Sequence, residues 1–281
     1  MKLMRVGPKG AEKPAMMDAG GTIRDLSAHV ADIDGSVLGA DGLAKLAAID
    51  PASLPEVSAD TRIGACVGKV GNVICVGLNY TDHAIETNNP IPTEPVLFSK
   101  AVTCLNGPND DVEKPRGSTM LDWEIELAII IGKRCKYVSE AEAMDYVAGF
   151  AVFNDVSERE FQTQRPGGQW LKGKSHETFG PLGPWMVTKD EVADPSDLAV
   201  ELKVNGQVMQ KGSTKTFIFH PRTVVSHISQ YLTLEPGDVI PTGTPPGVGA
   251  GMNPQVFLNP GDVMELEIQG LGSQRQTVVA A

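Results

Sequence analysis

The chain has 281 residues, of which 41% are apolar and 21% are charged, a balance that is ordinary for a globular protein with a sizeable core. Its formal net charge of −11 argues against nucleic acid and anionic membranes as partners, because both require a basic surface. No stretch approaches the roughly 18 to 20 consecutive apolar residues that a membrane helix needs, and the N-terminal residues lack the apolar run of a signal peptide.

The four cysteines are expected to be buried, reduced thiols. They show no CxxC pair or other close spacing typical of zinc ligands, and most stand beside apolar residues: Cys66, Cys75, Cys104 and Cys135. Since stable disulfides mark oxidising compartments, this cysteine usage favours a cytoplasmic protein.

The first 70 residues are predicted to form a small separate unit. Two strand-like runs, a helical stretch and a turn-rich segment follow one another within it: 3–6, 22–26, 42–49 and 50–55. The turn-rich segment has the composition of a linker. We therefore expect a small N-terminal domain over residues 1–70 and a larger catalytic domain over residues 71–281.

From residue 71 onward the sequence becomes rich in strand-like segments. Apolar runs and alternating patterns predict strands over 73–78, 95–99, 123–131, 147–154, 198–205, 238–242, 263–269 and 274–279. The pair Asn205-Gly206 between two such runs predicts a hairpin with a type I′ turn. Because strands dominate without a regular alternation with helices, we expect an α+β fold with mixed, β-rich sheets rather than a doubly wound one.

The clearest helix is predicted to begin near Pro221, a residue that suits the first helical position. Apolar residues recur on one face of this helix: Val224, Val225, Ile228 and Leu232. His220 and His227 flank this helix or lie on it, and we expect structural roles for both.

Two glutamates stand two residues apart in segment 122–131, directly ahead of a solid apolar block. In a strand, alternate side chains share a face, so Glu124 and Glu126 would project together. Neighbouring carboxylates raise each other's pKa and burial adds to this effect, whereas a divalent cation would remove the conflict. The alternative is a half-exposed strand with a solvated acidic face.

A third carboxylate, Asp155, follows the apolar run 147–154, a placement typical of a functional residue at the end of a strand. Three carboxylates without a histidine or cysteine ligand indicate a hard cation, Mg²⁺ or Mn²⁺. Asp155 has an alternative role as the cap of a following helix, because aspartate is a favoured capping residue.

Candidates for proton transfer and for anion binding lie elsewhere in the sequence. If residues 80–86 are helical, His83 and Glu86 lie one turn apart, and a histidine oriented by a carboxylate can take a proton from water. A surface ion pair is the alternative. Lys100 and Lys174 offer cations to an oxyanion or a carboxylate, although both have the alternative of being solvated loop lysines.

The glycine- and proline-rich segment 242–249 follows a predicted strand. It lacks the Gly-Lys-Ser/Thr ending of a phosphate-binding loop, so nucleotide binding is not indicated. A rigid turn that presents backbone N–H groups and threonine hydroxyls to a carboxylate is one reading, and a simple β-turn is the other.

Taken together, these segments resemble the fumarylacetoacetate hydrolase family from about Val73 to the C-terminus. The matching motifs are 77–80 with His83 and Glu86, 95–100, 122–127, 154–159 with Gln162, 174–181 in part, and 242–248. The resemblance implies a mixed β-roll, a homodimer, and magnesium or manganese held by two strand glutamates and an aspartate.

The resemblance also implies roles for individual residues. Glu124, Glu126 and Asp155 would be the metal ligands, and Lys174 would lie beside the metal. His83 and Glu86 would activate water. The positions that would contact the substrate are Tyr80, Lys100, Arg159, Gln162 and Thr244. The role of His176 is open, because many relatives have another residue at this position.

Within the family, residues 1–10 and 63–68 resemble bacterial members that act on sugar acids. These are the hydrolases of 2,4-diketo-3-deoxy-L-rhamnonate or the equivalent fuconate, which often carry the label ureidoglycolate lyase. The expected reaction is cleavage of the C3–C4 bond of a 2,4-dioxo acid to pyruvate and a 2-hydroxy acid. The alternatives are decarboxylation of oxaloacetate, dehydration of a 2-keto-3-deoxy sugar acid, and binding of a small 2-oxo acid without catalysis.

Overall fold

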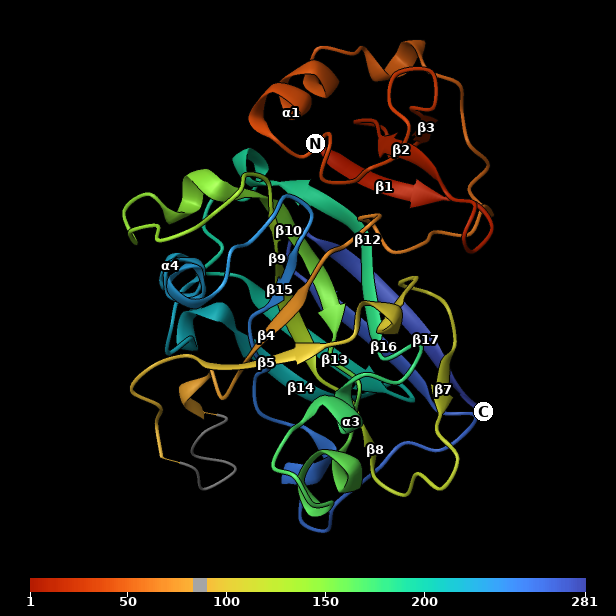
Figure 1. Ribbon diagram of the computed structural model, residues 1–281. Helices are drawn as coiled ribbons and strands as arrows, with labels where there is room; N and C mark the ends of the chain where they lie inside the picture. The colour runs from red at the N-terminus through yellow and green to blue at the C-terminus, as the bar shows by residue number, and fades with distance from the viewer. Residues whose placement is uncertain (83–89) are drawn as a thin grey trace.

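The computed structural model describes residues 1–82 and 90–281 of the chain. Within these ranges the protein is built mainly from strands, and the helices that accompany them are few and short (Figure 1). No helix in the described residues is long and apolar enough to cross a membrane.

A ten-stranded mixed sheet forms the centre of the molecule. Its strands are, in spatial order, β3 (Ile23–Asp25), β2 (Lys13–Met17), β1 (Lys2–Val6), β12 (Gly180–Thr188), β10 (Val147–Asn154), β9 (Ile125–Ile131), β15 (Val239–Pro241), β4 (Val73–Gly77) and β5 (Val96–Lys100), with β6 (Leu105–Asn106) paired to β12. The predicted strands of this sheet are confirmed within one or two residues at each end, and β9 begins two residues later than predicted. Strands β2, β6 and β12 were not predicted: a proline interrupts β2, glycines and prolines interrupt β12, and β6 has only two residues.

A second sheet packs beside the first. Its order is β14 (Gln207–Ser213), β13 (Ala199–Val204), β16 (Val263–Ile268), β17 (Gly272–Ala280) and β7 (Val112–Lys114), and a separate two-stranded pair joins β8 (Leu121–Asp122) to β11 (Ser157–Glu158). The predicted hairpin connects β13 to β14. Asn205 and Gly206 have φ values of 51° and 77°, and these positive angles confirm the predicted type I′ turn.

The described α-helices are α1 (Ala40–Ala47), α3 (Leu171–Lys174) and α4 (Pro221–Tyr231), and a π-helical turn spans Glu160–Gln164. Short 3-10 turns occupy Pro51–Ser53, Val102–Cys104, Ala143–Tyr146, Lys189–Glu191, Thr214–Thr216 and Gly249–Gly251. Helix α4 begins at the predicted proline and buries Val224, Val225 and Ile228. The prediction was wrong for Leu232, which follows the last turn and is 42% exposed.

The core lies on both faces of the central strands. Every residue of β9 and β10 is buried, which explains why both read as nearly continuous apolar runs rather than as alternating patterns. All four cysteines are buried and free, as predicted. Any polar side chain carried by these two strands or placed at their ends therefore faces the protein interior.

The N-terminal strands extend the central sheet instead of standing apart from it. β1 pairs with β12 in antiparallel register, and the N-terminal region lies at one end of the molecule (Figure 1). Arg62 joins the two regions through ion pairs to Glu12 at 2.9 Å and to Asp110 at 2.6 Å. The division into domains of residues 1–70 and 71–281 stays a prediction.

Candidate metal centre and active site

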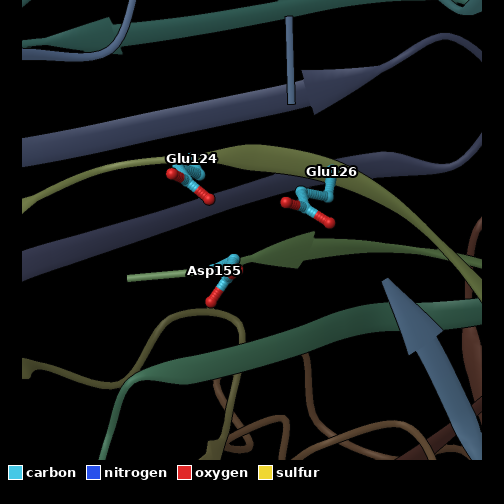
Figure 2. A group of neighbouring side chains, drawn as sticks. All are labelled: Glu124, Glu126 and Asp155. Carbon is cyan, nitrogen blue, oxygen red and sulfur yellow. The ribbon is translucent and has the colours of Figure 1, made fainter. Parts of the chain in front are cut away.

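Three carboxylates meet where β9 begins and β10 ends. In the antiparallel register Glu126 pairs with Phe153, so the first residues of β9 lie beside the last residues of β10. Asp155 follows β10 directly. One carboxylate oxygen from each of Glu124, Glu126 and Asp155 lies within 4.8 Å of the others, and Figure 2 shows the three side chains as neighbours.

Glu124 lies beside the other two carboxylates although it is not part of the strand in which it was predicted. β9 begins at Ile125, so the expected strand over 123–131 was wrong at its start. The backbone N–H of Glu124 donates to Oδ1 of Asn154 at 3.3 Å, and its carbonyl accepts from the N–H of Asp155 at 2.9 Å. A side-chain amide thus replaces the regular ladder partner and holds Glu124 beside Asp155.

The alternative readings of these carboxylates are excluded. Glu124, Glu126 and Asp155 are 7%, 2% and 0% exposed, which rules out a solvated acidic face. After Asp155 the chain continues as strand β11, so Asp155 does not cap a helix. The three groups form a buried cluster of like charge.

Two buried lysines contact the cluster. Nζ of Lys174, at the end of α3, lies 2.8 Å from Oε2 of Glu124 and 2.8 Å from Oδ2 of Asp155. Nζ of Lys100, at the end of β5, lies 2.5 Å from Oδ1 of Asp155 and donates to the carbonyl of Val156 at 3.2 Å. Both lysines are 3% exposed or less, so neither is a solvated loop lysine.

Arg159 adds a third cation and is itself held by a fourth carboxylate. Its Nη1 lies 2.7 Å from Glu124 and its Nε 2.8 Å from Asp122. Burial alone would lower the pKa of Arg159, but the Asp122 and Glu124 carboxylates raise it and keep the guanidinium charged. Nη1 also donates to Oε1 of Gln162 at 3.0 Å.

Asp122 was not singled out in the sequence analysis. It is fully buried, and its carboxylate accepts backbone N–H groups from Gly249 at 2.7 Å and Ala250 at 3.0 Å as well as the bond from Arg159. The one signal in the sequence is its place two residues ahead of Glu124. Its partners come from remote segments and only the fold brings them together.

The cluster carries more negative than positive charge. Burial raises the pKa of Glu126 well above its ordinary value, and the charges of Asp155 and Glu124 raise it further, although Lys174 and the N–H of Gly243, 2.8 Å from Oε2, oppose this. A divalent cation would relieve the repulsion. Three buried carboxylates without nitrogen or sulfur donors are a ligand set that fits a hard cation such as Mg²⁺ or Mn²⁺.

A cavity of about 390 Å³ opens onto this cluster. Of the residues with predicted roles, those that line it are Glu124, Glu126, Lys174, Arg159, Gln162 and Thr244. The Thr244 hydroxyl donates to the carbonyl of Ile125 at 2.8 Å and accepts from Gln210 at 2.7 Å, so it also fixes the start of β9. Segment 242–249 therefore forms part of the site and is not only a β-turn.

The remaining predicted residues lie elsewhere. Tyr80 is fully buried against Phe217, and its hydroxyl has no hydrogen-bond partner among the described residues. Lys100 lies behind Asp155 and is absent from the described lining of the cavity. His83 and Glu86 lie outside the described residues.

His176 packs outside the cavity of the carboxylates. Its ring lies between those of Phe161 and Phe179, with centroids 5.7 and 5.1 Å away. Burial lowers the pKa of this histidine, so the neutral ring is favoured in these surroundings. These contacts give the residue a packing role.

Comparisons with known proteins agree on one family. The family model described as fumarylacetoacetate (FAA) hydrolase, C-terminal, matches residues 72–279. A protein of Burkholderia cenocepacia (strain HI2424), whose name gives a hydrolase without a substrate, is 57% identical over 277 residues, which cover 98% of each chain. The solved fumarylacetoacetate hydrolase of Exiguobacterium antarcticum is 35% identical, with a TM-score of 0.87 and complete coverage of both chains.

A further solved structure carries ligands. The maleylpyruvate hydrolase of Sphingobium sp. SYK-6, in complex with manganese(II) and pyruvate, is 27% identical with a TM-score of 0.83 over the whole of both chains. Solved structures named as isomerases are also similar to this chain. These likenesses confirm the expected α+β fold with mixed, β-rich sheets. The chain belongs to the fumarylacetoacetate hydrolase family.

Proposed function

We propose that the protein is a metal-dependent hydrolase that cleaves the C3–C4 bond of a 2,4-dioxo acid and releases pyruvate and a 2-hydroxy acid. The observation that carries the proposal is the buried carboxylate cluster of Glu124, Glu126 and Asp155, of which Glu124 and Glu126 line a cavity. The candidate substrates are 2,4-diketo-3-deoxy-L-rhamnonate and its fuconate equivalent.

The balance of charge in the cluster supports a substrate with one carboxylate at its reacting end. Four carboxylates, of Asp122, Glu124, Glu126 and Asp155, face three cations, those of Lys100, Lys174 and Arg159. A dication would change this net negative charge into a positive one. One carboxylate of a 2-oxo acid would then neutralise it.

The bound metal and the side chains of the site would contribute different parts of the chemistry. When bound, Mg²⁺ or Mn²⁺ would supply a Lewis acid for the oxygens of a 2-oxo acid, and the manganese and pyruvate of the Sphingobium maleylpyruvate hydrolase support this assignment. Glu124, Glu126 and Asp155 would hold the ion. Lys174 contacts two of these carboxylates, which supports the proposal that its ammonium would donate to a developing enolate oxygen.

His83 is proposed as the base that takes a proton from the attacking water, with Glu86 orienting it. Attack on the C4 carbonyl and collapse of the adduct break the C3–C4 bond, so the electron pair goes to the enolate of pyruvate. A proton then converts that enolate into pyruvate. Decarboxylation of oxaloacetate would need the same enolate stabilisation but no attacking water.

The first experiment measures pyruvate release from 2,4-diketo-3-deoxy-L-rhamnonate, its fuconate isomer, a simple acylpyruvate and oxaloacetate. Each assay is run with a chelator and again after Mg²⁺ or Mn²⁺ is restored. Metal-dependent cleavage of a dioxo acid supports the proposal. Pyruvate from oxaloacetate alone would instead identify a decarboxylase, and tight binding without turnover of any substrate would identify a small-acid binding protein.

The role of His83 is tested by His83→Ala. We expect turnover to fall by about a hundred- to ten-thousandfold, the usual range for loss of a general base, while Mn²⁺ affinity is kept. His29→Ala is the matched control, because His29 is an exposed histidine in the N-terminal region. Full hydrolytic activity in His83→Ala would show that another group activates the water.

A further inference from the structure

The cavity changes in character from its floor to its mouth. At the floor, the charged side chains of Glu126, Lys174 and Arg159 are at most 9% exposed. At the mouth, the lining residues Thr163, Gln164 and Gln255 are exposed to solvent and uncharged. The two ends of a bound substrate would therefore meet different chemistry.

Positive charge in the described lining is confined to the floor. Arg159 and Lys174 supply it, and each is already within 2.8 Å of two carboxylates. A second carboxylate at the far end of a substrate would thus find no cationic partner in the described lining, whereas a hydroxyl would find uncharged hydrogen-bonding groups there.

Two cationic residues lie near Gln164 in the sequence, but each contacts groups outside the cavity. Arg165 follows Gln164, but its guanidinium pairs with Glu160 at 3.1 Å and lies 3.9 Å from the centroid of the Phe161 ring. Lys172 donates to the carbonyl of Pro166 at 2.9 Å. Arg165 and Lys172 line a neighbouring surface groove rather than this cavity.

The uncharged groups of the lining suit hydroxyls. A glutamine amide both donates and accepts hydrogen bonds, as a hydroxyl does, so the two can pair in either direction. The cavity wall also carries Trp170, whose ring lies 5.0 Å from that of Phe98 and gives an apolar surface for the carbon chain. Gly77 makes room for it, because a Cβ there would lie 2.8 Å from the Trp170 ring.

We infer that the mouth selects 2-oxo acids with an uncharged, hydroxyl-bearing tail and disfavours those with a second carboxylate, and that Gln164 and Gln255 are the specificity-determining residues. The inference deepens the proposed function and rests on it for the position of the reacting end at the floor.

The test separates binding from cleavage. Two 2-oxo acids of equal length that lack the 4-oxo group, one with a hydroxylated tail and one ending in a carboxylate, are titrated into the Mn²⁺-loaded protein by calorimetry. The matching pair of 2,4-dioxo acids is assayed for pyruvate release. We expect the neutral tail to be favoured about tenfold or more in both Kd and kcat/KM.

A charge placed at the mouth tests the assigned residues. In Gln255→Arg and in Gln164→Arg, the acid with two carboxylates is expected to gain about tenfold in affinity, and the gain is expected to shrink at high salt because the site is exposed. Gln207→Arg is the matched control. It adds the same charge at the exposed start of β14, outside the described lining.

The outcomes distinguish the inference from the proposed function. Equal or tighter binding of the second carboxylate by the parent protein overturns the inference, even if both dioxo acids are cleaved. Selective binding of the neutral tail without pyruvate release supports the inference and overturns the proposed hydrolase. An equal gain in Gln207→Arg would show that net charge rather than the mouth sets the preference.

Discussion

Glutamate pairs with a spacing of two residues recur in this sequence, and two of these pairs have opposite surroundings. Glu124 and Glu126 are buried at the start of β9, whereas Glu265 and Glu267 are exposed on β16, where they alternate with buried apolar residues. The exposed pair faces solvent and the neighbouring strand that carries Lys203. The spacing of two carboxylates is therefore not enough to define a metal site.

The difference lies in what covers each pair. Around Glu124 and Glu126, β10 contributes a third carboxylate at its end, and Lys174 and Arg159 approach from later segments. On the outer face of the second sheet, water screens the charges and exposed ion pairs contribute little. Two buried carboxylates repel each other strongly unless a cation compensates their charge, whereas exposed carboxylates are screened by water and need no cation.

The largest difference in metal affinity is expected between variants in which one glutamate of the buried pair or of the exposed pair is made neutral. Glu126→Gln removes a ligand from a three-carboxylate set, so Mn²⁺ affinity should fall by more than about a hundredfold, beyond the loss typical of an outer partner. Metal-dependent activity should fall with it. Glu267→Gln should change neither by more than about twofold. Calorimetric titration with Mn²⁺ measures the affinity of both variants, and equal losses of affinity would contradict the assignment of Glu126 as a metal ligand.

A smaller effect is expected from the amides that hold the buried pair in place. Asn154, whose side chain accepts the N–H of Glu124, donates to Gln276 on β17 at 3.0 Å, and Gln276 donates to Gln274 at 3.0 Å. Gln276→Leu would leave buried polar groups without partners and lower the free energy of unfolding by about 1–3 kcal/mol. We also expect Mn²⁺ affinity to fall about tenfold.

Ser273→Ala is the control for Gln276→Leu, because Ser273 is exposed on the same strand. Denaturant unfolding and Mn²⁺ titration are measured on both variants. If Gln276→Leu loses stability but keeps its metal affinity, these amides support packing alone. In that case they would not position Glu124.

The smallest effect is a pH dependence of the metal-free protein. The pKa of Glu126 is raised above its ordinary value of 4.5, first by burial and then by Asp155 and Glu124, so the folded state holds this proton more tightly than the unfolded state. Stability is thus lost as pH rises from about 4.5 through the folded-state pKa. Metal-free Glu126→Gln should melt at a higher temperature than the parent protein at pH 8.

This difference in melting temperature should shrink as the pH is lowered toward 4.5, the ordinary pKa of the group. Glu267→Gln is the control, because Glu267 is exposed on β16. Calorimetric melting of both variants in the presence of a chelator measures the effect. Equal melting of Glu126→Gln and the parent at pH 8 would mean that folding does not penalise the Glu126 carboxylate.

Much of the architecture could be predicted from local patterns. The apolar runs of β9 and β10, the Asn205-Gly206 turn and the proline at the start of α4 are local signals, and the structure confirms them. Leu232 was misplaced because the helix ends one residue before it. β12 was missed because its glycines and prolines mask an otherwise apolar strand.

Less of the candidate site could be predicted from the residues alone. The three carboxylates were identified by their spacing and their place beside apolar runs. Two features of the site could not be read from neighbouring residues in the sequence. One is the set of hydrogen bonds to Asp122, and the other is the bond from the Glu124 N–H to the Asn154 side chain in place of a strand partner. These contacts join segments up to 128 residues apart, and no local stretch of sequence can reveal them.

The sequence by itself determined many of the segments that become strands, which residue types are available for a hard cation, and the likeness to one enzyme family. Only the tertiary structure decided that the pair Glu124 and Glu126 is buried and which cations lie beside it. It also decided that the mouth of the cavity lacks positive charge in the described lining. The physical reason is that burial and charge pairing depend on neighbours from distant parts of the chain.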